Sequence, residues 1–148
     1  MNQLKESIER FEKIKYLWGH HMTMLQQAIY QSNNTIQTES QKIDLLKSYL
    51  LDYRAHAEKH NQSYHLKATK AFSDGLVKSI NQLQAKINHV EMNKKKYEQT
   101  YQMIDGKIKA LDTIILKKTK MFEYQTVKQE MKSIEDLFRS CNALKDSE

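Results

Sequence analysis

Apolar side chains recur from Leu4 to Ala57 at alternating spacings of three and four residues. If Ile8 is taken as heptad position a, positions a and d are Leu4, Ile8, Phe11, Lys15, Trp18, Met22, Leu25, Ile29, Ser32, Ile36, Glu39, Ile43, Leu46, Leu50, Tyr53 and Ala57. Only Lys15, Ser32 and Glu39 among them are not apolar. An unbroken 3.5-residue repeat flanked by polar residues predicts a coiled coil.

The pattern stops after Ala57 and resumes at Leu76. The second series of a and d positions is Leu76, Ile80, Leu83, Ile87, Val90, Lys94, Tyr97, Tyr101, Ile104, Ile108, Leu111 and Ile115. Asn61 and Ser63 suit a helix end and a new N-cap, and Ser73-Asp74-Gly75 is a second candidate break. We therefore expect helix one over about 3–58, a loop or short helix over 59–75, and helix two over about 76–141.

The composition excludes most other architectures. The 148 residues include no proline and three glycines, so the chain lacks the turn residues that sandwiches, barrels and βαβ folds require. Intrinsic disorder is disfavoured because 39% of the residues are hydrophobic. The two series predict an all-α fold, a single domain formed by a long two-helix antiparallel coiled-coil hairpin.

The polar core positions suggest how the two helices pair. Placing Glu39 opposite Lys94 gives both buried charges a partner, whereas a shift by one heptad would face Glu39 with Ile87 or with Tyr101. We therefore predict a buried Glu39–Lys94 pair. The same register opposes Lys15 and Lys118, which predicts a weak layer near the chain termini.

A different apolar stripe follows the second series. It consists of Tyr124, Val127, Met131, Ile134, Phe138 and Cys141. In the predicted register its members from Met131 onward extend beyond helix one as a C-terminal overhang. An unpaired apolar stripe indicates a binding surface, and fraying or self-association is the alternative.

The sequence contains no recognisable catalytic motif. His56 and His60 could share a helix face, but no third metal ligand is indicated, so we expect neither an enzyme nor a metal or other cofactor. One cysteine, no long apolar run and no signal peptide favour a cytoplasmic protein. The net charge of +6 permits an acidic partner, although interspersed acids favour a solvated helix face over a nucleic-acid site.

The segment Tyr49-Leu-Leu-Asp-Tyr53-Arg54, followed by Leu76-Val77-x-x-Ile80, resembles the flagellar export protein FliJ family. The size, the hairpin and the extended second helix are similar as well. The resemblance implies a non-enzymatic stalk of the type III export apparatus. Such a stalk is cytoplasmic, associates peripherally with the inner membrane, and binds the hexameric export ATPase, the cytoplasmic domain of the membrane export gate and export chaperones.

By position, the resemblance implies an export-gate contact at Lys42, Leu46, Tyr49, Tyr53, Leu76, Ile80, Leu83 and Ile87. Core packing is an equal interpretation of Leu46, Tyr53, Leu76 and Ile80, which occupy a or d positions. The ATPase-ring contact would be formed at the terminal end by Leu4, Phe11, Met131, Ile134 and Phe138. We expect no nucleic-acid partner and a monomer when the protein is free. A virulence-type secretion stalk, a dimeric coiled-coil scaffold and a basic nucleic-acid or lipid binder remain alternatives.

Overall fold

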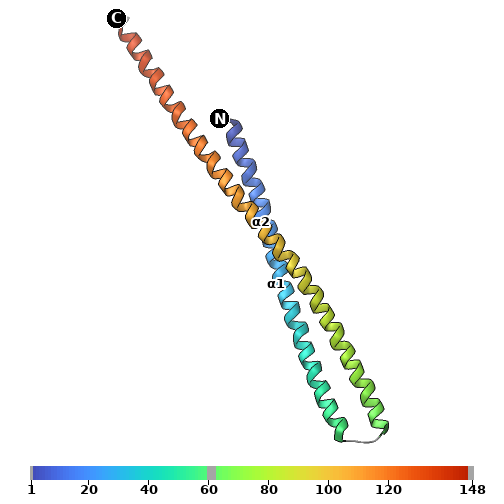
Figure 1. The fold of residues 1–148 in the computed structure, drawn as a ribbon. Coiled ribbons are helices and arrows are strands. Elements are labelled where there is room, and N and C mark those ends of the chain that lie inside the picture. The colour runs from blue at the N-terminus through green and yellow to red at the C-terminus, as the bar shows by residue number, and fades with distance from the viewer. Residues whose placement is uncertain (1, 60–62, 147–148) are drawn as a thin grey trace. The chain divides into compact units, whose positions relative to one another are not determined.

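The protein consists of two long α-helices in the computed structural model (Figure 1), which describes residues 2–59 and 63–146. Helix α1 spans Asn2–Lys59 and helix α2 spans Ser63–Asp146. The two helices pack against each other as an antiparallel hairpin, so the predicted all-α fold is confirmed. Side chains are described for residues 2–58 and 67–145.

Helix α2 begins earlier than the heptad pattern predicted. It starts at Ser63 and runs through Ser73, Asp74 and Gly75, where we expected a break. The polar residues Thr69 and Ser73 continue the a and d spacing backward from Leu76, and both are half-buried. The rows of a and d residues along which the two helices pack form the seam of the hairpin. Small polar side chains can therefore extend this seam where apolar residues are lacking. Asn61, the expected helix end, lies outside the described residues.

The hairpin divides into two compact units. The hairpin unit is Thr23–Gln102, and the terminal unit contains the described residues 2–22 and 103–146. Among the described residues, the buried apolar side chains are Leu25, Ile43 and Ile87 in the hairpin unit and Ile104 and Leu111 in the terminal unit. All five occupy predicted a or d positions, so burial follows the 3.5-residue period within each unit.

The register within the hairpin unit differs from the predicted one by one heptad. Glu39 Oε1 accepts a hydrogen bond from Lys86 Nζ at 3.2 Å, and Tyr101 Oη accepts one from Gln26 Nε2 at 3.1 Å. These contacts place Glu39 opposite Ile87. The predicted Glu39–Lys94 pair is therefore wrong, and Lys94 instead forms an ion pair with Glu98, one turn along its own helix, at 3.8 Å.

Flanking lysines explain why the chain tolerates this register. Glu39 is only 4% exposed, yet Lys86 and Lys42 reach its Oε1 atom from positions beside the seam, at 3.2 and 3.3 Å. A lysine stem can lie along apolar surface while its ammonium group stays at the edge of that surface, and Lys42 and Lys86, both more than half exposed, reach the Glu39 carboxylate in this way. A core acid therefore needs no core base as its partner. Its second oxygen, Oε2, is buried without a hydrogen-bond partner.

The terminal unit shows the same one-heptad difference. Lys15 forms an ion pair with Asp112, and Lys118 donates a 2.7 Å hydrogen bond to Ser7 Oγ. The ammonium groups of Lys107 and Lys118 also lie over the rings of Trp18 and Phe11, at 5.4 and 5.1 Å from the ring centroids. The predicted Lys15–Lys118 layer is therefore wrong, because each lysine has its own partner on the opposing helix.

Helix α2 extends beyond the start of α1 within the terminal unit (Figure 1). Phe122, Gln125 and Thr126 are the last half-buried residues of α2 before the described side chains become uniformly exposed. The overhang therefore begins about one heptad earlier than the predicted register implied. Tyr124 and Val127 of the apolar stripe are exposed, whereas Phe122, which continues the a and d series of α2, is half-buried. The stripe therefore does not become the face of α2 that packs against α1.

Candidate functional site: two exposed apolar surfaces

Aromatic side chains line a shallow hollow in the hairpin unit. Its lining residues are Tyr49, Asp52, Tyr53, His56 and Phe72, and its volume is about 420 Å³. The rings of Tyr53 and Phe72 are stacked at a tilt, with centroids 4.4 Å apart and planes at 32°. Aromatic surface that remains accessible on a polar helix pair can bind an apolar side chain of a partner. We call this hollow the aromatic site.

Helical spacing brings the members of the aromatic site together. Tyr49, Tyr53 and His56 follow one another at intervals of four and three residues, which places them on one side of α1. Phe72 comes from α2 and is held against Tyr53 by the antiparallel pairing. Half of the Tyr49 side chain is accessible to solvent. The aromatic site therefore depends on both helices.

Most of the other residues that the resemblance implied for a gate contact lie in the seam. Lys42 forms an ion pair with Glu39, and Ile87 is buried. The half-buried members are Leu46, Leu76, Ile80 and Leu83. Of the eight residues, Tyr49 and Tyr53 are those that line the aromatic site. Phe72 was missed because the segment around it was assigned to the connection between the helices.

The terminal unit carries a second exposed apolar surface on the overhang of α2. The stripe residues Tyr124, Val127, Met131, Ile134 and Phe138 are between 53% and 69% exposed, and Cys141 is exposed as well. Leu4 and Phe11, which the resemblance grouped with this end, are half-buried in the seam with α2. The structure thus separates Met131, Ile134 and Phe138, which are accessible, from the two α1 residues.

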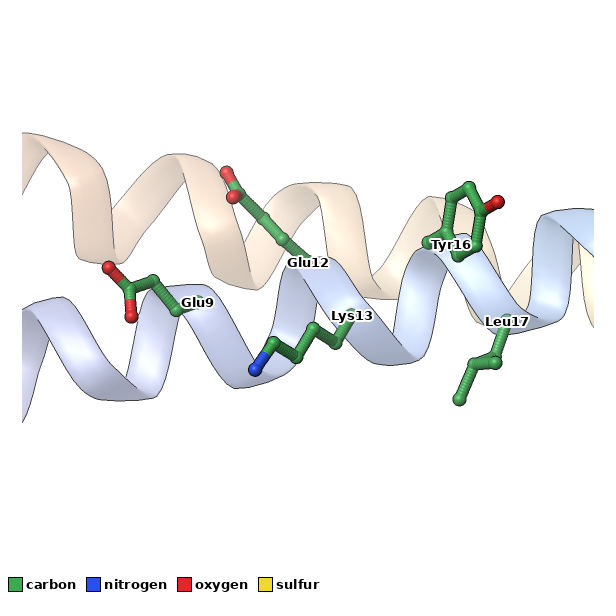
Figure 2. Close-up of a pocket in the computed structure, with 5 residues that line it drawn as sticks. All are labelled: Glu9, Glu12, Lys13, Tyr16 and Leu17. Atoms are coloured by element: carbon green, nitrogen blue, oxygen red, sulfur yellow. The ribbon is translucent and has the colours of Figure 1, made fainter.

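A shallow hollow of about 470 Å³ lies on the outer side of α1 in the terminal unit, where Tyr16 and Leu17 are exposed. Figure 2 shows its five lining side chains, Glu9, Glu12, Lys13, Tyr16 and Leu17, all projecting from α1. Because a single helix supplies every lining residue, the hollow resembles a surface groove between neighbouring side chains rather than a cleft between elements.

The lysine-rich part of α2 is partly neutralised by its own acids. Lys109 pairs with Asp105 at 3.0 Å and Lys94 pairs with Glu98 at 3.8 Å, both across one helical turn. Pairs of this kind are typical of a solvated helix face. They favour that interpretation over a continuous basic surface for nucleic acid.

Neither a membrane span nor a metal cluster emerges from the part of the chain that the structure describes. Neither α1 nor α2 has a stretch apolar enough to cross a bilayer. Within residues 2–59 and 63–146, no three or more His, Cys, Asp or Glu side chains gather as potential metal ligands. His60, considered above together with His56, lies outside the described residues.

No family model, curated protein or solved structure matches this chain. The class that the fold defines is an antiparallel helical hairpin of coiled-coil type.

Proposed function

We propose that the chain is a non-enzymatic adaptor of the flagellar type III protein export apparatus. In this proposal the aromatic site binds the cytoplasmic domain of the membrane export gate, and the overhang of α2 binds the hexameric export ATPase. Export chaperones are further partners. The protein would act in the cytoplasm, at the inner face of the membrane.

One observation carries this proposal. Among the described residues, the aromatic site lies in the unit Thr23–Gln102, and the exposed stripe on the overhang of α2 lies in the terminal unit. Exposed apolar side chains that cluster on one surface mark sites of protein–protein contact. Two separate surfaces on one chain suit a protein that binds two partners at the same time. The segments 49–54 and 76–80 resemble the FliJ family, and this resemblance supplies the identity of the two partners.

Replacing Ile134 and Phe138 by aspartate should abolish binding of the export ATPase. Both side chains are more than 60% exposed, so their loss leaves helix content unchanged while two charges now occupy the apolar stripe. A pull-down with the purified ATPase measures binding, and circular dichroism measures helicity. The control Ser133→Asp with Asn142→Asp adds the same charge to the same segment away from the stripe. Full binding by the first variant would refute the ATPase contact.

Replacing Tyr49 by alanine should weaken gate binding at least tenfold, because a large aromatic contact is lost from the aromatic site. The melting temperature should change by less than about 2 °C, since Tyr49 is half-exposed and outside the seam. Isothermal titration calorimetry with the gate domain measures the affinity. Tyr30→Ala, an exposed tyrosine of the same unit and helix, is the matched control. A large loss of stability would show that Tyr49 is a packing residue instead.

A further inference from the structure

The exposed stripe on the overhang has the spacing of a second coiled-coil seam. Its members are Tyr124, Val127, Met131, Ile134, Phe138 and Cys141, and the intervals between them alternate between three and four residues. Such a seam buries its apolar side chains only when a second helix lies along it. In this protein α1 does not cover it, since the stripe is exposed throughout.

The stripe lies on the side of α2 that faces away from α1. Phe122 and Gln125 are half-buried against α1, whereas Tyr124 and Val127, two residues further along, are exposed. Two residues correspond to a rotation of about 200° around the helix. A helix bound along the stripe would therefore leave the packing between α1 and α2 undisturbed.

We propose that the stripe is the interface of a homodimer in which the overhangs of two copies pair antiparallel. With position a opposite position d, Met131 meets Ile134 of the partner subunit and Val127 meets Phe138 of the partner subunit. Tyr124 then meets Cys141 of the partner subunit. All of the stripe residues find an apolar neighbour in one symmetric arrangement, as a twofold interface requires.

The charges beside the stripe favour the antiparallel orientation. In that orientation Lys128 faces Glu135 of the partner subunit, and symmetry repeats the attraction on the other side. In a parallel dimer, Glu130 would instead face Glu135 of the partner subunit, which places like charges together twice. Lys120 and Lys145 continue the spacing at the two ends of the stripe and would face each other, so they limit the interface to the stripe itself.

The homodimer is independent of the flagellar proposal, because it rests on the spacing, exposure and flanking charges of α2 alone. It differs from the monomer expected from the sequence. It also adds a consequence for any partner that uses Met131, Ile134 and Phe138, since such a partner would have to compete with the second copy.

Sedimentation equilibrium of the full chain at roughly 1–100 µM tests the interface. The test compares the natural sequence with variants in which a flanking charge is reversed. We expect a monomer–dimer equilibrium for the natural sequence. Lys128→Glu and Glu135→Lys should each raise the dissociation constant about tenfold, because each places two pairs of like charges across the interface. The double variant should restore it. Both side chains are exposed, so the variants keep their fold, which circular dichroism checks.

Oxidation with diamide tests the orientation. In the antiparallel dimer the two copies of Cys141 are separated by seventeen residues of helix, about 25 Å, which is too far for a disulfide. We expect no covalent dimer from the natural sequence and a covalent dimer from Tyr124→Cys. A monomer throughout the concentration range would overturn the proposal. It would also be overturned by tighter association of Glu135→Lys, or by a disulfide through Cys141 alone, both of which indicate a parallel dimer.

Discussion

Replacing Ile87 by aspartate should lower the melting temperature by about 10–15 °C. Ile87 is 6% exposed and lies opposite Glu39, so the variant loses a buried aliphatic side chain and places two carboxylates in one layer. Losing the apolar contacts and burying a like charge should together cost about 3–5 kcal/mol. Thermal unfolding followed by circular dichroism at 222 nm measures the change.

Two further variants make this prediction specific to the register. Asn81→Asp adds the same charge at an exposed position of the same helix and should leave the melting temperature within about 2 °C. Adding Glu39→Gln to Ile87→Asp should recover part of the loss, because one of the two facing carboxylates is removed. No recovery would contradict the register, since Ile87 would face Leu46 if the helices paired one heptad further along.

Replacing Glu39 by leucine should raise the melting temperature by about 5 °C. The buried carboxylate has one oxygen without a partner, and leucine would pack its apolar side chain against Ile87 instead. Lys42 and Lys86 are both more than half exposed, so they return to solvent without cost. Glu39→Gln retains a polar side chain of similar shape and should not stabilise the protein.

The same residue makes part of the stability depend on pH. The hydrogen bond from Lys86 holds the pKa of the Glu39 carboxyl below its ordinary value of 4.5, against the opposing effect of burial, and Lys42 assists. A lowered pKa means that this stabilisation is present above pH 4.5 and is lost as the pH falls through the folded-state pKa. The advantage of Glu39→Leu should therefore widen below pH 4.5. An advantage that stays constant from pH 7 to pH 3 would contradict the ion-pair assignment.

The heptad pattern predicted the helices and their packed faces but not their register. A shift by seven residues returns every a and d position to an a or d position, so apolar periodicity cannot distinguish one register from the next. The predicted register was selected because it places Glu39 opposite Lys94 within the core. The partner it has, Lys86, occupies a flanking position that heptad reasoning treats as solvated.

The candidate site was predicted in part, for a related reason. Tyr49 was expected among the gate-contact residues by resemblance, and the structure places it in the aromatic site. Phe72 was missed because polar seam residues such as Ser73 hid the start of α2 from a search for apolar periodicity. On the overhang, the exposure of Met131, Ile134, Phe138 and Cys141 was predicted correctly, because that prediction requires only that α2 extend beyond the start of α1 and holds in either register.

The short connection between α1 and α2 also sets the order in which the hairpin closes. Tyr53 and Phe72 are in contact although only about twenty residues separate them in the sequence, whereas Ser7 and Lys118 are 111 residues apart. Bringing Ser7 and Lys118 together first would cost about 1.5 kcal/mol more conformational entropy than bringing Tyr53 and Phe72 together. Contacts near the connection should therefore form first, and contacts progressively farther from it should form afterwards. Opening should follow the reverse order. The first residues of α1 would then be released before any others, which would uncover the α1-facing side of α2 next to the overhang while the aromatic site remains assembled.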